Sequence, residues 1–172
     1  MITILQKENK KLREIARPVP LTNIATQKIK KIITDMKTAM HGEDDAVAIA
    51  APQIGISLRI FIVSGKIFLS KKERFQAPQN KALHPDLVFV NPELLKRSRK
   101  ETLVEEGCLS VRWLYGKVKR SEKATVRAYD ECGNRFTRGA SGILAQVFQH
   151  EIEHLDGILF PDKARELHEM PP

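Results

Sequence analysis

Two histidines and a glutamate in the last third of the chain have the spacing of a metal site. The stretch His150-Glu151-Ile152-Glu153-His154 has the pattern H-E-x-x-H. On a helix, residues four positions apart lie on one face, so His150 and His154 can bind the same metal ion while Glu151 stands beside them. This arrangement predicts a metal-activated hydrolase.

The residues before the motif support its placement on a helix. Three fixed positions occur by chance in roughly 2% of chains of this length, so the pattern alone is weak. At about 100° per residue, Ile143 and Val147 share the face of the two histidines. The histidines are therefore predicted to point into the protein.

A catalytic metal site typically has three protein ligands and one open position, so a third ligand must come from elsewhere in the chain. The candidates are two cysteines, three further histidines and many carboxylates. Cys132 lies in a turn sequence between two strand-like runs, and we interpret it as an ordinary thiol at or near the surface. Cys108 follows Gly107, which permits an unusual backbone angle or a close approach, as a ligand at a strand end would need.

Three separated motifs resemble those of the peptide deformylases and occur in the same order. Residues 46–53, Ala-Val-Ala-Ile-Ala-Ala-Pro-Gln, are similar to the family's G-x-G-x-A-A-x-Q. Residues 106–110 match its E-G-C-L-S, and residues 149–154 match its Q-H-E-x-x-H. Shorter similarities extend the resemblance over roughly residues 10–163.

The resemblance implies that Cys108, His150 and His154 bind one divalent metal ion. A thiolate with two imidazoles suits Fe(II), which is the expected native ion, and also accepts Zn(II), Ni(II) or Co(II). The fourth position is expected to hold water, whose pKa the cation lowers toward neutrality.

The resemblance also implies three catalytic roles. Glu151 is expected to take the proton of the attacking water and later to deliver it to the leaving amine. The side-chain amide of Gln53 and the backbone N–H of Leu109 are expected to stabilise the oxyanion, although on composition alone Gln53 would be an ordinary loop residue. Glu106 and Glu153 are either solvated charges or carboxylates that orient a ligating imidazole, and we leave both outside the catalytic set.

The implied function is that of a peptide deformylase, a metal-dependent hydrolase that removes the N-formyl group from the N-terminal methionine of newly synthesised proteins and releases formate. Two other classes remain open. A zincin-type metallopeptidase would use the same histidine pair and glutamate to cut internal amide bonds. A non-catalytic, metal-stabilised RNA-binding module would combine a closed four-ligand site with the basic charge of the chain.

The departures from the family pattern lie near the expected substrate. Ala46 and Ala48 stand where the family has glycines, and a methyl group there disfavours positive φ and narrows close backbone approach. After the second motif, Arg112, Trp113 and Tyr115 either line a peptide groove or pack on the body of the protein. We therefore predict an intact metal site with a changed peptide preference.

The length and composition fit one catalytic domain over residues 1–172. The chain is 42% hydrophobic and 29% charged, enough to bury one core without splitting into two. Residues 64–85 include a polar, lysine-rich stretch that we expect to be a surface insertion. The apolar run at the N-terminus is too short for a signal peptide, and two cysteines argue against a disulfide framework, so a cytoplasmic location is expected.

The chain has 29 basic and 21 acidic side chains, which gives a formal net charge of +8 at pH 7. Such an excess favours polyanions, and ribosomal RNA is the expected candidate for a weak contact, although most lysines could simply be solvated. The other expected partners are N-formyl-methionyl peptides and nascent chains, with neither a membrane nor DNA. The tail at residues 162–172 is short, so docking through a C-terminal helix is not expected to carry over from the family.

The order of elements favours the α+β class. An amphipathic helix is predicted from a cap at Thr22 or Asn23 to Gly42, with an apolar stripe at Ile29, Ile32, Ile33, Met36 and Met40. Strands are predicted at residues 58–63, 86–90, 123–129 and 135–138. The resemblance implies mixed or antiparallel sheets around a central helix that carries the H-E-x-x-H pair.

Overall fold

The computed structural model describes residues 2–69 and 84–171. Within these ranges the long helices are α1 (Gln27–His41) and α3 (Gly142–Leu155). The strands are β1 (Ala48–Ala50), β2 (Ile60–Val63), β3 (Leu87–Arg97), β4 (Glu101–Gly107), β5 (Leu114–Ser121), β6 (Lys123–Tyr129), β7 (Arg135–Ser141) and β8 (Arg165–Glu169). Short 3-10 turns are η1 (Lys10–Arg13), η2 (Leu21–Asn23), η3 (Ala51–Ile54), η4 (Gly65–Phe68) and η5 (Phe160–Asp162). None of the described helices has the length and apolar character needed to cross a membrane.

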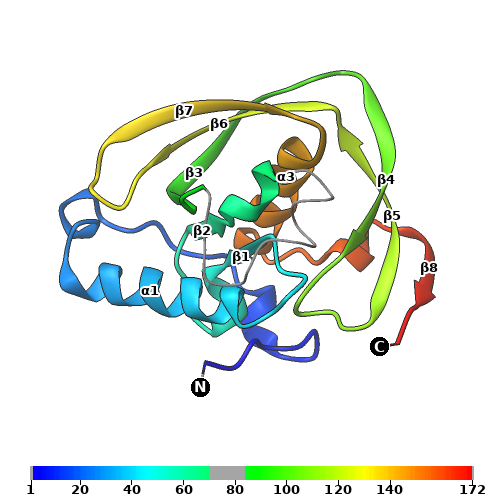
Figure 1. Cartoon of the computed structure of the whole chain (residues 1–172), viewed down its shortest axis with the longest axis horizontal. Helices are drawn as coiled ribbons and strands as arrows, with labels where there is room; N and C mark the ends of the chain where they lie inside the picture. Colours follow the sequence, from blue (N-terminus) through cyan, green and yellow to red (C-terminus); the bar gives the residue numbers. More distant parts are fainter. Residues whose placement is uncertain (1, 70–83, 172) are drawn as a thin grey trace.

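The strands form two antiparallel sheets with α3 between them. Five strands pair in the order β1-β2-β3-β6-β7, and three pair in the order β4-β5-β8. In Figure 1 the three-stranded sheet lies to the right of α3, with β8 at its outer edge. The prediction of an α+β fold with antiparallel sheets around a central helix is confirmed.

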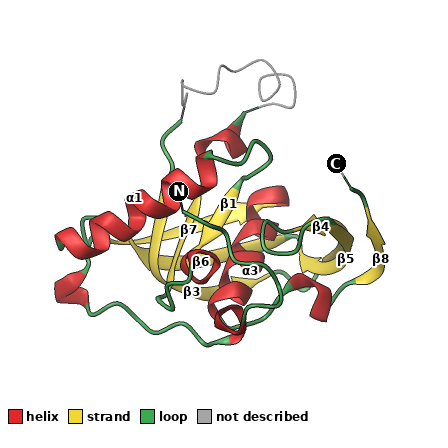
Figure 2. Cartoon of the chain, turned by 90° about the horizontal axis from the view of Figure 1, so that it is seen from below, coloured by secondary structure: helices red, strands yellow, loops and turns green. Residues whose placement is uncertain are grey.

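The side chains of β2 show why the five-stranded sheet is covered on both faces. All four are fully buried, and alternate residues of a strand point to opposite faces. Phe61 lies in the apolar cluster around α3, whereas Ile62 lies in the cluster that α1 covers, and Figure 2 shows α1 along its side of the sheet. The ring of Phe61 stacks on Phe89 at 4.4 Å, and Phe148 of α3 meets Phe89 at 5.1 Å between ring centroids. Aromatic packing thus fixes α3 on the sheet.

Helix α1 has the predicted apolar stripe but begins later than predicted. The stripe faces the core, with Ile32 half-buried and the other members buried, namely Ile29, Ile33, Met36 and Met40. The prediction of a cap at Thr22 or Asn23 was wrong, because both residues belong to the turn η2 and the N-cap is Thr26. The hydroxyl of Thr26 donates to the carbonyl of Asn23 at 2.7 Å. Gly42 ends the helix, as predicted.

The predicted strands correspond to β2, β3, β6 and β7, but β3 continues well beyond its predicted end at residue 90. Its pairing with β6 shifts register after Val90, where Asn91 has a positive φ of 50°. The other four strands were not predicted. Of the expected insertion at residues 64–85, the start forms η4, and residues 70–83 lie outside the described residues.

Candidate metal centre

The histidine pair lies on α3, and Cys108 reaches it from the end of β4. The ligand atoms of Cys108, His150 and His154 all lie within 4.8 Å of one another. The Sγ of Cys108 is 3.2 Å from Nε2 of His154. Burial lowers the pKa of His154 well below its usual value, so the ring is neutral and can offer a lone pair to a cation. One sulfur and two imidazole nitrogens form a donor set that fits Fe(II) or Zn(II).

A close approach at Gly107 places Cys108. A Cβ atom at residue 107 would lie 2.5 Å from the ring of Tyr115, which faces Gly107 across the β4–β5 pair. Such a contact is too short for a side chain at residue 107, so glycine allows the Tyr115 ring to lie over the backbone here. After the strand, the N–H of Val111 donates to the carbonyl of Cys108 at 3.0 Å and turns the chain away.

Glu106 orients the first histidine. Its Oε2 lies 3.0 Å from Nδ1 of His150, so a proton on Nδ1 is bound by the carboxylate and Nε2 is left for a cation. Arg120 donates to both carboxylate oxygens of Glu106, at 2.7 and 2.8 Å. Although burial would raise the pKa of Glu106, its hydrogen bonds with Arg120 and His150 lower it to about 2. Glu106 therefore stays charged and accepts a hydrogen bond from Nδ1 of His150.

Arg120 also connects Glu106 to further charged side chains next to the site. Arg120 also donates to Glu153 at 2.6 Å, and Glu153 accepts from Lys163 at 2.6 Å. Glu106 and Glu153 are thus ion-paired groups of the interior rather than solvated charges. Arg120 is 3% exposed, and sequence reasoning missed it. It lies in a basic stretch, Lys117 to Arg120, in which both lysines project toward solvent. Only the pairing of β4 with β5 distinguishes it.

Glu151 is a buried carboxylate beside the histidines. It is 4% exposed, and its Oε2 has no hydrogen-bond partner within the described part of the chain. Burial raises the pKa of Glu151 to about 7, while the nearby His150 acts in the opposite direction. A carboxyl group with such a pKa can accept and release a proton near neutral pH.

Gln53 and Leu109 place two hydrogen-bond donors next to Cys108. The N–H of Ala50 donates to Oε1 of Gln53 at 2.8 Å, which fixes the orientation of the amide. Its Nε2 therefore faces Ser110 Oγ at 3.2 Å and Cys108 Sγ at 3.6 Å. Among the described residues, the N–H of Leu109 donates to no backbone or side-chain acceptor. Both residues line the cavity next to Cys108, where an oxyanion could accept from such donors.

An N-terminal segment, residues 5–16, ties the three motifs together. The N–H of Leu5 donates to the carbonyl of Gln53 at 2.8 Å, and Nε2 of Gln6 donates to the carbonyl of Leu109 at 3.1 Å. The N–H of Ala16 donates to the carbonyl of Leu155, the last residue of α3, at 2.8 Å. Sequence reasoning gave no indication of this segment's role, because two of these three contacts are made by backbone N–H groups and all three are accepted by backbone carbonyls.

A pocket of about 360 Å³ is lined by Cys108, His150 and Glu151. Ala46 and Ala48 line it, and neither has positive φ, so the chain accommodates both methyl groups without strain. Arg112, Trp113 and Tyr115 also line the pocket. Of the two interpretations of these three residues, the structure favours the groove. Outside this pocket, Cys132 is exposed in the β6–β7 turn, which confirms its interpretation as a surface thiol.

Comparison with known proteins identifies a single family. The family model described as "Polypeptide deformylase" matches residues 1–170. Peptide deformylase 2 of Clostridium acetobutylicum is 37% identical over 160 residues, which cover 92% of this chain and 92% of that protein. The chloroplastic/mitochondrial peptide deformylase 1A of Arabidopsis thaliana is 42% identical over 154 residues, 88% of this chain and 57% of that protein.

Solved structures of the same family share the fold. The Met-Ala-Ser-bound class I type b peptide deformylase of Acinetobacter baumannii superposes with a TM-score of 0.82 at 32% identity, covering 95% of this chain and 98% of that one. A peptide deformylase of Synechococcus elongatus in complex with actinonin gives a TM-score of 0.82 at 28% identity, covering 96% and 81%.

Proposed function

The chain belongs to the polypeptide deformylase family, and we propose on that premise that Cys108, His150 and His154 are the metal ligands of its active site. The protein is a metal-dependent hydrolase that removes the formyl group from N-terminal formylmethionine. The observation that supports the assignment is the convergence of a thiol and two imidazoles beside the unpartnered carboxylate of Glu151. Family membership favours this function over a metallopeptidase or an RNA-binding module.

We propose Fe(II) as the native ion, with Zn(II), Ni(II) and Co(II) as ions that the same donors accept. The thiolate makes the donor set softer than three nitrogen or oxygen ligands, which suits these metals. A divalent ion in this site supplies Lewis acidity. The chain's contribution is the orientation of the donors, and Glu106 provides it for His150.

Glu151 is proposed to move the proton of the reaction. Its buried carboxylate first takes a proton from the attacking water and then delivers it to the amine that leaves. The pKa of about 7 that burial gives this group supports both steps at neutral pH. The Oε2 of Glu151 also supports the assignment. Because no described residue hydrogen-bonds to this oxygen, it can receive a proton without breaking a structural contact.

The Gln53 amide and the Leu109 N–H are proposed to stabilise the oxyanion on the formyl carbon. Both donors are held before the reaction begins, since the Ala50 N–H fixes the amide of Gln53. Donors in place beforehand stabilise developing charge without reorganisation, and one such donor typically contributes about 100-fold or more in rate.

The decisive experiment is formate release from N-formyl-Met-Ala-Ser after anaerobic purification, with elemental analysis of the same sample. We expect turnover by the parent protein, with iron as the main bound metal. The variant Glu151→Gln should lose about 10²-fold or more of the rate while it keeps its metal, because the carboxylate handles protons and does not bind the ion. Formate release by E151Q at the parental rate would overturn the role of Glu151.

We also propose that residues 1–172 form one catalytic domain that works in the cytoplasm, with residues 64–85 as a surface insertion. The family match over residues 1–170 supports a single domain. Two free cysteines and formylated nascent chains as substrates are consistent with a reducing compartment where translation occurs.

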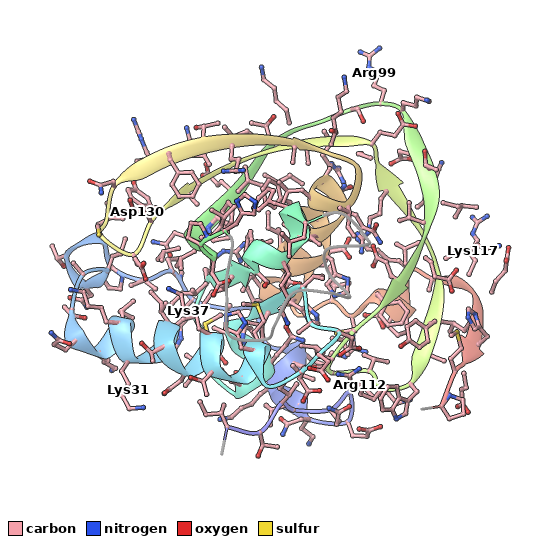
Figure 3. All side chains as sticks on the ribbon, in the orientation of Figure 1. Lys31, Lys37, Arg99, Arg112, Lys117 and Asp130 are labelled. Carbon is pink, nitrogen blue, oxygen red and sulfur yellow. The ribbon has the colours of Figure 1, made fainter. Side chains whose placement is uncertain are left out.

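A weak ribosome contact is proposed for the turn between β3 and β4. The exposed residues Lys96, Arg97, Arg99 and Lys100 crowd this turn. Arg99 projects outward at the top of Figure 3. Lys100 pairs with Glu122 at 2.9 Å, whereas the other three take part in no ion pair among the described residues. The first four residues of β4 separate the turn from the pocket by about 13 Å, so RNA bound at the turn would leave the pocket open.

Sedimentation with ribosomes at about 50 mM and about 200 mM salt tests this contact. Binding to RNA phosphates weakens steeply with salt, so we expect pelleting only at low salt. Replacing Lys96, Arg97 and Arg99 by glutamine should abolish it. The matched control replaces three exposed lysines elsewhere by glutamine, namely Lys7, Lys28 and Lys30. Equal losses in both triple variants would contradict a specific contact at the turn.

A further inference from the structure

The two proposed oxyanion donors come from different parts of the fold. Gln53 lies in η3, directly after β1 of the five-stranded sheet, whereas Leu109 follows the end of β4 in the three-stranded sheet. Two donors stabilise one developing charge only when both are held at the position that the charge will occupy. The rate of the reaction therefore depends on how the two segments are fixed relative to each other.

The side chain of Gln53 links the two segments directly, but the reaction would disturb this link. Its Nε2 faces Ser110 Oγ at 3.2 Å and Cys108 Sγ at 3.6 Å. An amide nitrogen carries two hydrogens, so an oxyanion that accepts from Nε2 replaces one of these contacts. A second link that does not involve this amide would keep the segments in place while the amide changes its partner.

Leu5 and Gln6 make such a link. The N–H of Leu5 donates to the carbonyl of Gln53 at 2.8 Å, and Nε2 of Gln6 donates to the carbonyl of Leu109 at 3.1 Å. Two residues that are adjacent in the chain thus hold one backbone group of each proposed donor residue. We call Leu5 and Gln6 the clamp.

The clamp has contacts of its own that fix its position. The side chain of Leu5 packs on the apolar cluster that contains Leu12 and Val111. Gln6 is exposed, and its Nε2 also donates to the carbonyl of Ile4 at 3.3 Å. The amide of Gln6 therefore uses both of its hydrogens on backbone carbonyls, which restricts its orientation.

The carbonyl that Gln6 binds belongs to a peptide unit beside the metal site. A peptide unit is planar, so the carbonyl of Leu109 and the N–H of Ser110 move together. The N–H of Ser110 donates to Sγ of Cys108 at 3.4 Å. Contacts at both ends of this unit limit rotation of the Leu109 backbone, on which the direction of the Leu109 N–H depends.

We propose that Gln6 is a positioning residue for the oxyanion donors and that the clamp raises kcat without contributing to the binding of the peptide. The inference rests on the proposed function, because the oxyanion role of Gln53 and Leu109 is itself proposed. The described lining of the pocket does not include Gln6, so this residue acts through Leu109 and not by contact with the substrate.

The variant Gln6→Met tests the proposal, because it keeps the length of the side chain and removes the donor. We expect kcat for N-formyl-Met-Ala-Ser to fall about threefold to tenfold, the factor by which one neutral hydrogen bond typically shifts an equilibrium. KM and the inhibition constant of the product Met-Ala-Ser should stay within about twofold of the parental values, because the oxyanion forms only in the transition state.

Two further variants serve as controls. Gln6→Lys retains a donor of similar reach and should keep most of the parental kcat, measured at about 0.3 M salt to screen the added charge. Gln27→Met makes the same substitution as Q6M at an exposed residue of α1 and should leave kcat unchanged. The metal content and the urea unfolding curve of Q6M should match those of the parent protein, because Gln6 is exposed and binds no metal.

Three outcomes overturn the role of Gln6: a parental kcat in Q6M, an equal fall of kcat in Q6M and Q27M, or a fall in Q6M that is matched by loss of metal or of stability. Each of them leaves the deformylase assignment intact, because the parent protein still releases formate. The absence of formate from the parent protein with metal bound would instead contradict the proposed active site itself, and with it the clamp.

Discussion

The five-stranded sheet supports the helix that carries the two histidines of the candidate metal centre, and the three-stranded sheet leads into Cys108, yet the two sheets hold these residues differently. Helix α3 packs Phe148 against the aromatic residues of the five-stranded sheet, so apolar burial fixes the two histidines. The three-stranded sheet is largely exposed, and it supplies Cys108 beside the ion pair of Glu106 and Arg120. The comparison suggests that stability resides mainly in the first region, whereas the second region mainly tunes the metal site.

Removing one proposed ligand from each region tests whether both regions are needed to bind the metal. We expect Cys108→Ala and His154→Ala each to lower metal affinity by about 10³-fold or more, because two remaining ligands bind weakly, and to stop formate release. Metal content after dialysis and formate release measure the effect. Cys132→Ala, which removes the exposed thiol, should change neither. Retention of the metal by C108A would break the comparison, since the three-stranded sheet would then supply no ligand.

Core truncation should separate the two regions in stability. We expect Phe148→Ala to lower the free energy of unfolding by about 3–5 kcal/mol, because the side chain is fully buried and a cavity remains. Leu103→Ala on β4 removes a side chain that is 48% exposed, so it should change the free energy of unfolding by about 0.5 kcal/mol or less. Urea unfolding monitored by circular dichroism measures both, with a chelator present to remove the contribution of metal binding. Similar losses would show that the two regions contribute equally to stability.

The smallest expected effect concerns the ion pair that supports His150. We expect Arg120→Met to weaken metal affinity by about 10- to 100-fold, because Glu106 loses the cation that keeps it charged. Competition with a chelator of known affinity measures this loss. In the double variant with Glu106→Gln, a neutral amide oxygen can still accept from His150, so part of the affinity should return.

The control for Arg120 is Arg127→Met, which breaks the exposed ion pair with Glu93 in the five-stranded sheet. It should leave metal affinity unchanged, because exposed pairs contribute little and this one does not contact a ligand. If R127M lowered the metal affinity as much as R120M, the loss of affinity would reflect general destabilisation of the protein rather than the orientation of His150.

The sequence allowed prediction of the elements whose periodicity is strong. The apolar stripe of α1 and the continuous apolar run of β2 are local patterns, and each was enough to predict its element. The strand β4 was not predicted because it is mostly exposed and polar, and it is defined by pairing with β5 rather than by its own pattern. The start of α1 was misplaced because Thr22, Asn23 and Thr26 are all capping types, and only the fold selects among them.

The candidate site divides in the same way. The helical spacing of His150 and His154 placed them together from sequence alone, and Gly107 marked Cys108 as a candidate third ligand. Gln53 and Leu109 entered only through the family resemblance. The supporting ion pair was beyond prediction, since nothing local distinguishes a buried arginine in a strand from its exposed neighbours. The pairing of β4 with β5, which are separate in the sequence motifs, thus determines which charged residues support the site.

The N-terminal segment at residues 5–16 has a consequence for biosynthesis. Translation produces this segment before Gln53, Leu109 and Leu155, whose carbonyl groups it binds. The bond from Ala16 to Leu155, which joins the segment to α3, therefore cannot form until α3 has left the ribosome. An enzyme of this family thus cannot join all three motifs of its active site until the helix that carries the histidine pair has been made.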